Sequence, residues 1–246
     1  MRNLKSYDSL VRRILDSEEK PAVILLFTTQ ENGKSLQSTH MKIGIAYGLP
    51  MLSYRNAVLP AIQEGLFKWS DISPDNIHPN TRGHALIGEI IARYLDSVYT
   101  RLSVLDCNVK ALPKAITEDI YREAEIYNSL NITPAEADGF TVQTVFEPFP
   151  DGWHTESGGS LKFEIQAACI GVLYYRTTDG LNGKYTVYID GKVVGELDGD
   201  FSGGWGSYAE AAEIYTSDRK MIHTIEIKTA VDSEKKKFSV LGLSVS

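Results

Sequence analysis

The chain has 246 residues, of which 43% are hydrophobic and 23% charged, as is ordinary for a globular protein of one large or two modest domains. Its formal net charge of -7 excludes nucleic acid and anionic membranes as main partners, because binding to phosphate requires a basic surface. Cys107 and Cys169 are too few for a disulfide framework and lack the spacing of a metal site. We therefore expect a neutral ligand and neither metal nor cofactor.

The first hundred residues alternate helix and strand patterns. Helices are expected at residues 7–15, 36–47, 56–64 and 83–99, and buried strands at 22–28 and 50–54. The strand, helix, strand order predicts a right-handed parallel crossover. The sequence shows no apolar signal region, and its longest apolar run, residues 22–27, is too short to span a bilayer. These patterns predict a soluble α/β domain at residues 1–104 and leave the cellular location open.

A polar loop before the last of these helices carries the strongest chemical motif. Asp75 precedes His78 by three residues, and Pro79 follows immediately. This spacing lets the carboxylate bind one ring nitrogen of the imidazole and leaves the other nitrogen facing a substrate, as in a hydrolytic triad. We therefore predict that Asp75 orients His78 as a general base. His84, at the start of the helix, is expected in a supporting role.

The element order and this motif resemble a known family. The strands at 22–28 and 49–54, and Asp75-x-x-His78-Pro79 followed by Gly83-His84, resemble the C-terminal half of the SGNH (GDSL-type) hydrolases over about residues 5–100. The resemblance implies a partial flavodoxin-like three-layer α/β/α half-domain. It also implies a serine esterase without a cofactor, in which His78 is the base and Asp75 its orienting carboxylate.

The family's nucleophile and oxyanion-hole motifs have no counterpart in the sequence. Tyr7-Asp8-Ser9-Leu10 imitates the Gly-Asp-Ser-Leu motif by letter, but only six mostly polar residues precede it, so no strand can present Ser9. Ser9 is interpreted as a helix residue. The inner neighbour of the strand at 22–28 is also missing, and an exposed apolar edge favours association. We expect that edge to pair with another copy in a homo-oligomer, or with a separately supplied N-terminal fragment.

The second half of the chain has a β pattern. Short β-type runs alternate with glycine turns from residue 139 onward, and Asp190-Gly191 is a strong hairpin signal. An all-β jelly-roll-like sandwich is predicted at residues 139–246, as in the accessory domains of carbohydrate esterases. Residues 105–138 are expected to form a connector with a short helix at 117–129.

Several polar and aromatic residues of this half are candidates for binding. Trp153 and Trp205 lie in glycine-containing loops, where they would stack on sugar rings or, alternatively, fill the end of the sandwich core. His154 and His223 are interpreted as structural. Asp198-Gly199-Asp200 falls short of a calcium shell.

Two functions are compatible with these features. The first is an SGNH/GDSL-type serine esterase that removes O-acyl groups, above all acetyl, from carbohydrate, with activity impaired by loss of the N-terminal half. The alternative is a non-catalytic esterase remnant whose β-sandwich acts as a carbohydrate-binding module. Acylated carbohydrate or a small ester is the expected substrate in the first case, and a glycan is the ligand in the second.

Overall fold

A computed structural model describes residues 2–104, 111–203 and 206–246. Cys107 lies outside these residues. The chain divides into two compact units, Met1–Arg122 and Glu123–Ser246. The first unit is mixed α/β, and the second is a large antiparallel β-sheet region. Each unit is described by itself.

The first unit is built on two short parallel strands. β1 (Leu25–Phe27) pairs with β2 (Met51–Ser53), with Leu25 opposite Met51. The helix between them, α2 (Gln37–Tyr47), ends at Gly48, which adopts the left-handed conformation with φ 63°. The parallel strand, helix, strand unit predicted from the sequence is therefore confirmed. Within the described chain, no strand pairs with the other edge of β1.

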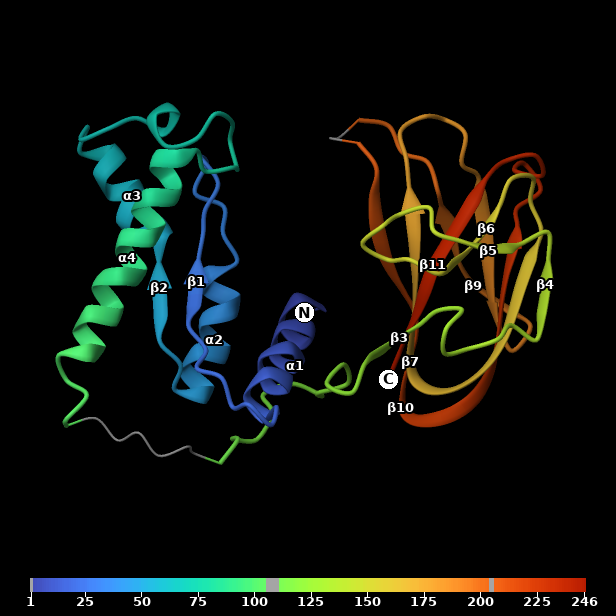
Figure 1. Ribbon diagram of the computed structural model, residues 1–246, viewed down its shortest axis with the longest axis horizontal. Helices are drawn as coiled ribbons and strands as arrows, with labels where there is room; N and C mark the ends of the chain where they lie inside the picture. Colours follow the sequence, from blue (N-terminus) through green and yellow to red (C-terminus); the bar gives the residue numbers. More distant parts are fainter. Residues whose placement is uncertain (1, 105–110, 204–205) are drawn as a thin grey trace. The chain divides into compact units, whose positions relative to one another are not determined.

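Helices flank both sides of these strands (Figure 1). α1 (Arg2–Asp16) and α2 lie on one side, and α3 (Tyr54–Gln63) and α4 (Thr81–Tyr99) on the other. Two buried clusters correspond to the two sides: Val11, Leu25, Phe27 and Ile43 in one, and Tyr54, Val58, Trp69 and Ile72 in the other. None of the helices in the described ranges has both the length and the apolar character needed to cross a membrane.

The expected helix at 117–129 is wrong, and the structure shows turns followed by β3 (Glu125–Tyr127). Asp119 has a φ of 54°, which a right-handed helix does not accept. Its carboxylate instead accepts a 2.8 Å hydrogen bond from Nε of Arg12. The buried carboxylate of Asp8 accepts hydrogen bonds from both the backbone N–H and the hydroxyl of Thr117. These contacts attach the middle of the expected connector to α1.

The described residues of the second unit form nine strands. They are β3, β4 (Glu136–Asp138), β5 (Thr141–Gln143), β6 (Gly152–Thr155), β7 (Ser160–Arg176), β8 (Lys184–Ile189), β9 (Lys192–Asp198), β10 (Tyr208–Thr229) and β11 (Phe238–Val245). The main strand order is β5-β6-β11-β7-β10-β8-β9. β3 and β4, which lie in the expected connector, pair with β11 and β7, so residues 123–138 belong to the second unit and the described residues before them to the first.

β7 and β10, the two longest strands, bend so that the sheet encloses an apolar core. β7 and β10 turn over together at one end (Figure 1), where their register shifts between Thr216 and Met221. The enclosed apolar cluster includes Phe163, Tyr185 and Phe238. The expected hairpin is confirmed, because Asp190 and Gly191 join β8 and β9 with φ values of 52° and 75°.

Candidate active site

Buried side chains hold the loop that carries Asp75 and His78 by hydrogen bonds to its backbone. η1 (Trp69–Asp71) begins the loop, and the indole Nε1 of Trp69 donates a 2.6 Å hydrogen bond to the carbonyl oxygen of Asp75. The buried hydroxyl of Ser73 lies 2.6 Å from that same oxygen and 2.7 Å from the carbonyl oxygen of His78. One hydroxyl therefore ties together the backbones of both candidate residues.

The loop is also fixed to the start of α4. The side-chain oxygen of Asn80 caps the helix by accepting a 3.0 Å hydrogen bond from the N–H of Gly83. A side chain at Gly83 would collide with the carbonyl oxygen of Ile72, and its Cβ would lie 2.9 Å from Cβ of Pro79. The absence of a side chain at position 83 thus lets α4 pack directly against the loop, close to the dyad.

Asp75 and His78 form a hydrogen-bonded dyad. Oδ2 of Asp75 lies 2.8 Å from Nδ1 of His78, and Oδ1 accepts 2.7 Å hydrogen bonds from the N–H groups of Ile77 and His78. The backbone N–H of His78, its ring and the N–H of Ile77 together lower the pKa of Asp75 to about 2. The carboxylate is therefore charged at neutral pH, and it favours the tautomer with the proton on Nδ1.

The second ring nitrogen is the chemically useful one. The His78 side chain is 77% exposed, and within the described part of the chain its Nε2 has no hydrogen-bond partner. With Nδ1 protonated and bound to Asp75, Nε2 presents a lone pair to the outside. A lone pair oriented in this way can take a proton from a hydroxyl group, which is the work of a general base.

A cavity of about 570 Å³ borders this loop. Ile77 forms part of its wall, and the remaining lining residues are Tyr7, Leu26, Phe27, Thr28, Thr29, Gln30, Lys34, Ser35, Leu36, Gln37 and His40. The rings of Tyr7 and His40 are stacked at 3.8 Å. Burial lowers the pKa of His40 and raises that of Tyr7, which favours the uncharged form of each. The part of the wall formed by these two rings therefore carries no charge at neutral pH.

The other predicted residues are not gathered at this site. His84 is exposed on the first turn of α4, and no hydrogen bond joins its side chain to the dyad among the described residues. Ser9 is 1% exposed and its hydroxyl accepts from the N–H of Tyr121, which agrees with its interpretation as a helix residue. In the parts of the chain that the structure describes, no cluster of three or more His, Cys, Asp or Glu is arranged to hold a metal ion.

Trp153 fills the core, which is the second of the two interpretations of its sequence context. Trp153 is 2% exposed in β6, and its ring packs edge-on against Phe163 at 5.0 Å within the core. The alternative interpretation, a core-filling role, is the observed one. Trp205 lies outside the described residues.

Sequence analysis missed the groups that hold and surround the dyad. Ser73 and Trp69 hold the loop by hydrogen bonds to backbone carbonyl oxygens, so no spacing rule identifies them in the sequence. Tyr7 and His40 come from different helices and meet only through tertiary packing.

Two solved esterase structures are similar to this chain over almost its whole length. The chain is similar to a two-domain esterase (CEX) active on acetylated mannans, with a TM-score of 0.89 and 25% identity over 99% of this chain and 68% of that chain. A structure of such an esterase co-crystallised with mannopentaose gives a TM-score of 0.87 and 25% identity, over 99% and 67% of the two chains. The fold resembles that of a carbohydrate esterase.

Sequence comparisons are less informative than the fold. No protein-family model matches the chain, and no curated protein matches it.

Proposed function

We propose that the chain acts in the hydrolysis of O-acetyl esters on a neutral polysaccharide, with an SGNH-type mechanism and acetylated mannan as substrate. The Asp75–His78 dyad carries this proposal, because its carboxylate is charged, its imidazole is oriented and its Nε2 points outward. The similarity to an esterase active on acetylated mannans supports the substrate class. The cavity bordered by Ile77 is the proposed place of the acetylated sugar unit.

The dyad performs the proton transfers. A serine oxygen attacks the acetyl carbonyl carbon while Nε2 of His78 takes the hydroxyl proton. The tetrahedral intermediate then collapses, the ester C–O bond breaks, and the imidazolium returns the proton to the departing sugar oxygen. Water next attacks the acetyl-serine, His78 takes the proton of that water and returns it to the serine oxygen, and acetate leaves. Asp75 stabilises the imidazolium throughout.

The nucleophile is proposed to come from a strand paired with the free edge of β1. No serine hydroxyl lies within hydrogen-bond distance of Nε2 of His78 among the described residues. β1 has β2 on one side and a free edge on the other, and strands that end at one sheet edge present their loops together. We propose that another copy of the chain pairs there and brings a serine that lies outside the family's Gly-Asp-Ser motif close to Nε2 of His78. A strictly monomeric protein in light scattering at micromolar concentration would contradict this pairing.

Acetate release from acetylated mannan tests the function. The assembled protein should release acetate, His78→Ala should lower kcat/KM by about 10²- to 10⁴-fold, and the control His84→Ala should leave it unchanged. A fluorophosphonate probe should label one serine of the wild-type protein, and peptide mass spectrometry would identify it. Absence of both acetate release and labelling would overturn the proposal.

Glycan binding without catalysis is the second candidate. The absence of a serine at Nε2 of His78 in the described chain favours it. This function predicts that mannopentaose binds to the protein although the fluorophosphonate probe labels nothing. Mannopentaose is the choice because it was co-crystallised with the similar esterase.

A further inference from the structure

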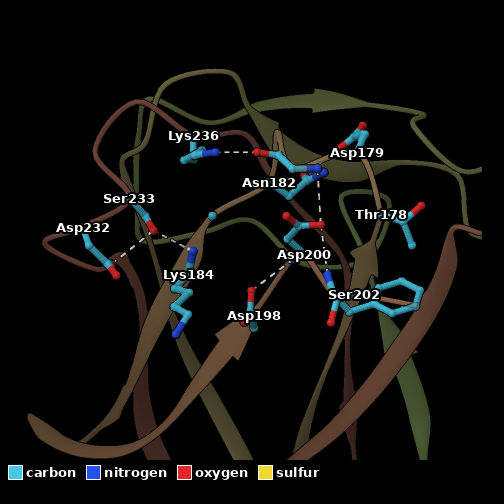
Figure 2. Close-up of a pocket in the computed structure, with 13 residues that line it drawn as sticks. Thr178, Asp179, Asn182, Lys184, Asp198, Asp200, Ser202, Asp232, Ser233 and Lys236 are labelled. Carbon is cyan, nitrogen blue, oxygen red and sulfur yellow. Dashed lines mark hydrogen bonds between the residues drawn. The ribbon is translucent and has the colours of Figure 1, made fainter. Parts of the chain in front are cut away.

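A second cavity, of about 580 Å³, lies in the β unit (Figure 2). Three loops build it: the one between β7 and β8, the one between β9 and β10, and the one between β10 and β11. Figure 2 shows Asp198 and Asp200 near its centre, with Asp179 on one side and Asp232 and Lys184 on the other. Its lining is mainly polar, so a ligand must form hydrogen bonds there.

One buried amide provides an acceptor in this cavity. Asn182 is 8% exposed, and its Nδ2 donates a 2.6 Å hydrogen bond to the hydroxyl of Thr177, which in turn donates a 2.7 Å hydrogen bond to Asp179. This chain of donors fixes the orientation of the amide. Oδ1 of Asn182 has no hydrogen-bond partner in the described ranges and is open to solvent, so it is available to accept a hydrogen bond from a ligand. An unpaired acceptor held in place within a cavity points to a ligand with donor groups.

Two carboxylates add further acceptors. Oδ1 of Asp198 accepts from the N–H of Asp200, and Oδ1 of Asp200 accepts from the N–H of Phe201 at 2.9 Å. The Oδ2 atoms of both have no hydrogen-bond partner within the part of the chain that the structure describes. The lysines of the cavity are engaged, Lys184 with Glu196 and Lys236 with the carbonyl oxygen of Gly180. The available groups are therefore mostly acceptors with negative charge.

An aromatic ring and an arginine shape the wall. Phe201 lines the cavity, and the guanidinium carbon of Arg176 lies 5.1 Å from the centre of its ring. The same guanidinium donates a 2.9 Å hydrogen bond to the carbonyl oxygen of Asp200. Arg176 thus positions both the ring and the acidic loop. An apolar ring beside several acceptors matches a sugar, which has C–H faces and many hydroxyl donors.

We propose that this cavity binds an uncharged sugar unit of a polysaccharide, with Asn182, Asp198 and Asp200 accepting hydrogen bonds from its hydroxyl groups and Phe201 contacting its C–H face. The carboxylates disfavour uronic acids, because like charges repel in a partly desolvated site. This inference deepens the second candidate function and does not depend on ester hydrolysis. It assigns the binding to residues other than Trp153, which is in the core.

Calorimetry on the full chain tests the site. Mannopentaose and xylopentaose serve as neutral probes, and pentagalacturonic acid as the anionic probe. At least one neutral probe should bind, and the anionic probe should bind at least tenfold more weakly. Asp200→Asn should weaken binding of the neutral probe about tenfold or more, since it removes the charge but keeps an acceptor for the N–H of Phe201. Asp218→Asn is the matched control, because the Asp218 side chain is 88% exposed on β10 and lies outside the cavity lining.

Variants also distinguish sugar binding in this cavity from a contribution of the proposed active site. His78→Ala should leave the affinity for the neutral probe unchanged, whereas Thr177→Val should weaken it because the chain of donors to Asn182 is broken. Unchanged thermal melting of Asp200→Asn would show that the variant is folded. Failure of both neutral probes to bind, equal binding of the anionic probe, or unchanged affinity in a folded Asp200→Asn variant would each overturn the proposal.

Discussion

Oδ2 of Asp75 lies 2.8 Å from Nδ1 of His78, on a loop where both side chains are largely exposed. An exposed hydrogen bond to a carboxylate of this kind contributes little to stability. The buried groups beneath it, Trp69 and Ser73, nevertheless hold the backbone of both residues in one geometry. Because buried groups fix the backbone beneath an exposed imidazole, we infer that the imidazole has a chemical role and not a stabilising one.

The orientation of His78 predicts a defined response to Asp75→Asn. The asparagine keeps an oxygen for the N–H groups of Ile77 and His78, but its amide group favours the tautomer with the proton on Nε2. Nε2 then cannot accept a proton. We expect kcat/KM for acetylated mannan to fall by about 10²-fold or more with an unchanged melting temperature. Full activity of Asp75→Asn would show that the carboxylate does not orient the base.

The carboxyl group of Asp75 should titrate at about pH 2, below its ordinary value of 3.8. Because the folded-state pKa is lowered, the ionised group stabilises the loop above pH 3.8, and this contribution is lost as the pH falls toward 2. In His78→Ala the backbone N–H donor remains, so the pKa should rise but stay below 3.8. Carbon-13 NMR of the Asp75 carboxyl group measures both values, and an ordinary midpoint in the wild-type protein would contradict the geometry.

The contact between the loop and α4 predicts that Gly83→Ala is destabilising. Its methyl group would collide with the backbone carbonyl oxygen of Ile72, and overpacking of this kind costs about 1–3 kcal/mol. Gly88→Ala on the same helix is the matched control. A Cβ at Gly88 meets only open space, and alanine stabilises a helix interior by about 0.5–1 kcal/mol relative to glycine. In urea unfolding, the free energy of unfolding should fall for Gly83→Ala and rise for Gly88→Ala. Equal changes in the two variants would mean that the loop moves to accommodate the methyl group at no cost.

The hairpin between β8 and β9 depends on an aspartate. Oδ2 of Asp190 lies 2.7 Å from Nδ1 of His223, a side chain that is 3% exposed, and Oδ1 accepts from the N–H of Thr224. Asp190→Ala leaves the buried Nδ1 without a partner, so we expect a loss of about 1–3 kcal/mol. Asp190→Asn, which tolerates positive φ and keeps an acceptor for Thr224, should lose less. A ranking in the opposite order, measured by urea unfolding, would contradict this role.

Local patterns predicted much of the fold. The apolar runs around β1 and β2 and the Asp190-Gly191 turn depend on neighbouring residues, and both were confirmed. The helix expected at 117–129 failed because long-range contacts decided the conformation. Arg12 and Asp8 on α1 bind Asp119 and Thr117, more than 100 residues away.

The sites show the same division between local and long-range information. The Asp75–His78 hydrogen bond was predicted because the partners are three positions apart in the sequence, and the structure contains it. The burial of Trp153 against Phe163 was not decided by the sequence, since flanking glycines are compatible with both exposure and burial. The acceptors around Asn182 come from three separate loops, so only the folded chain brings them together.

Chemical rescue of His78→Ala tests the central claim most directly. If Nε2 of His78 is the general base, the variant should lose about 10²- to 10⁴-fold in kcat/KM for p-nitrophenyl acetate, and added imidazole should restore part of the rate. The restored rate should increase with the concentration of neutral imidazole, while His84→Ala should be fully active without it. A His78→Ala variant that retains wild-type activity, or that loses activity and gains nothing from imidazole while remaining folded, would contradict the role of His78.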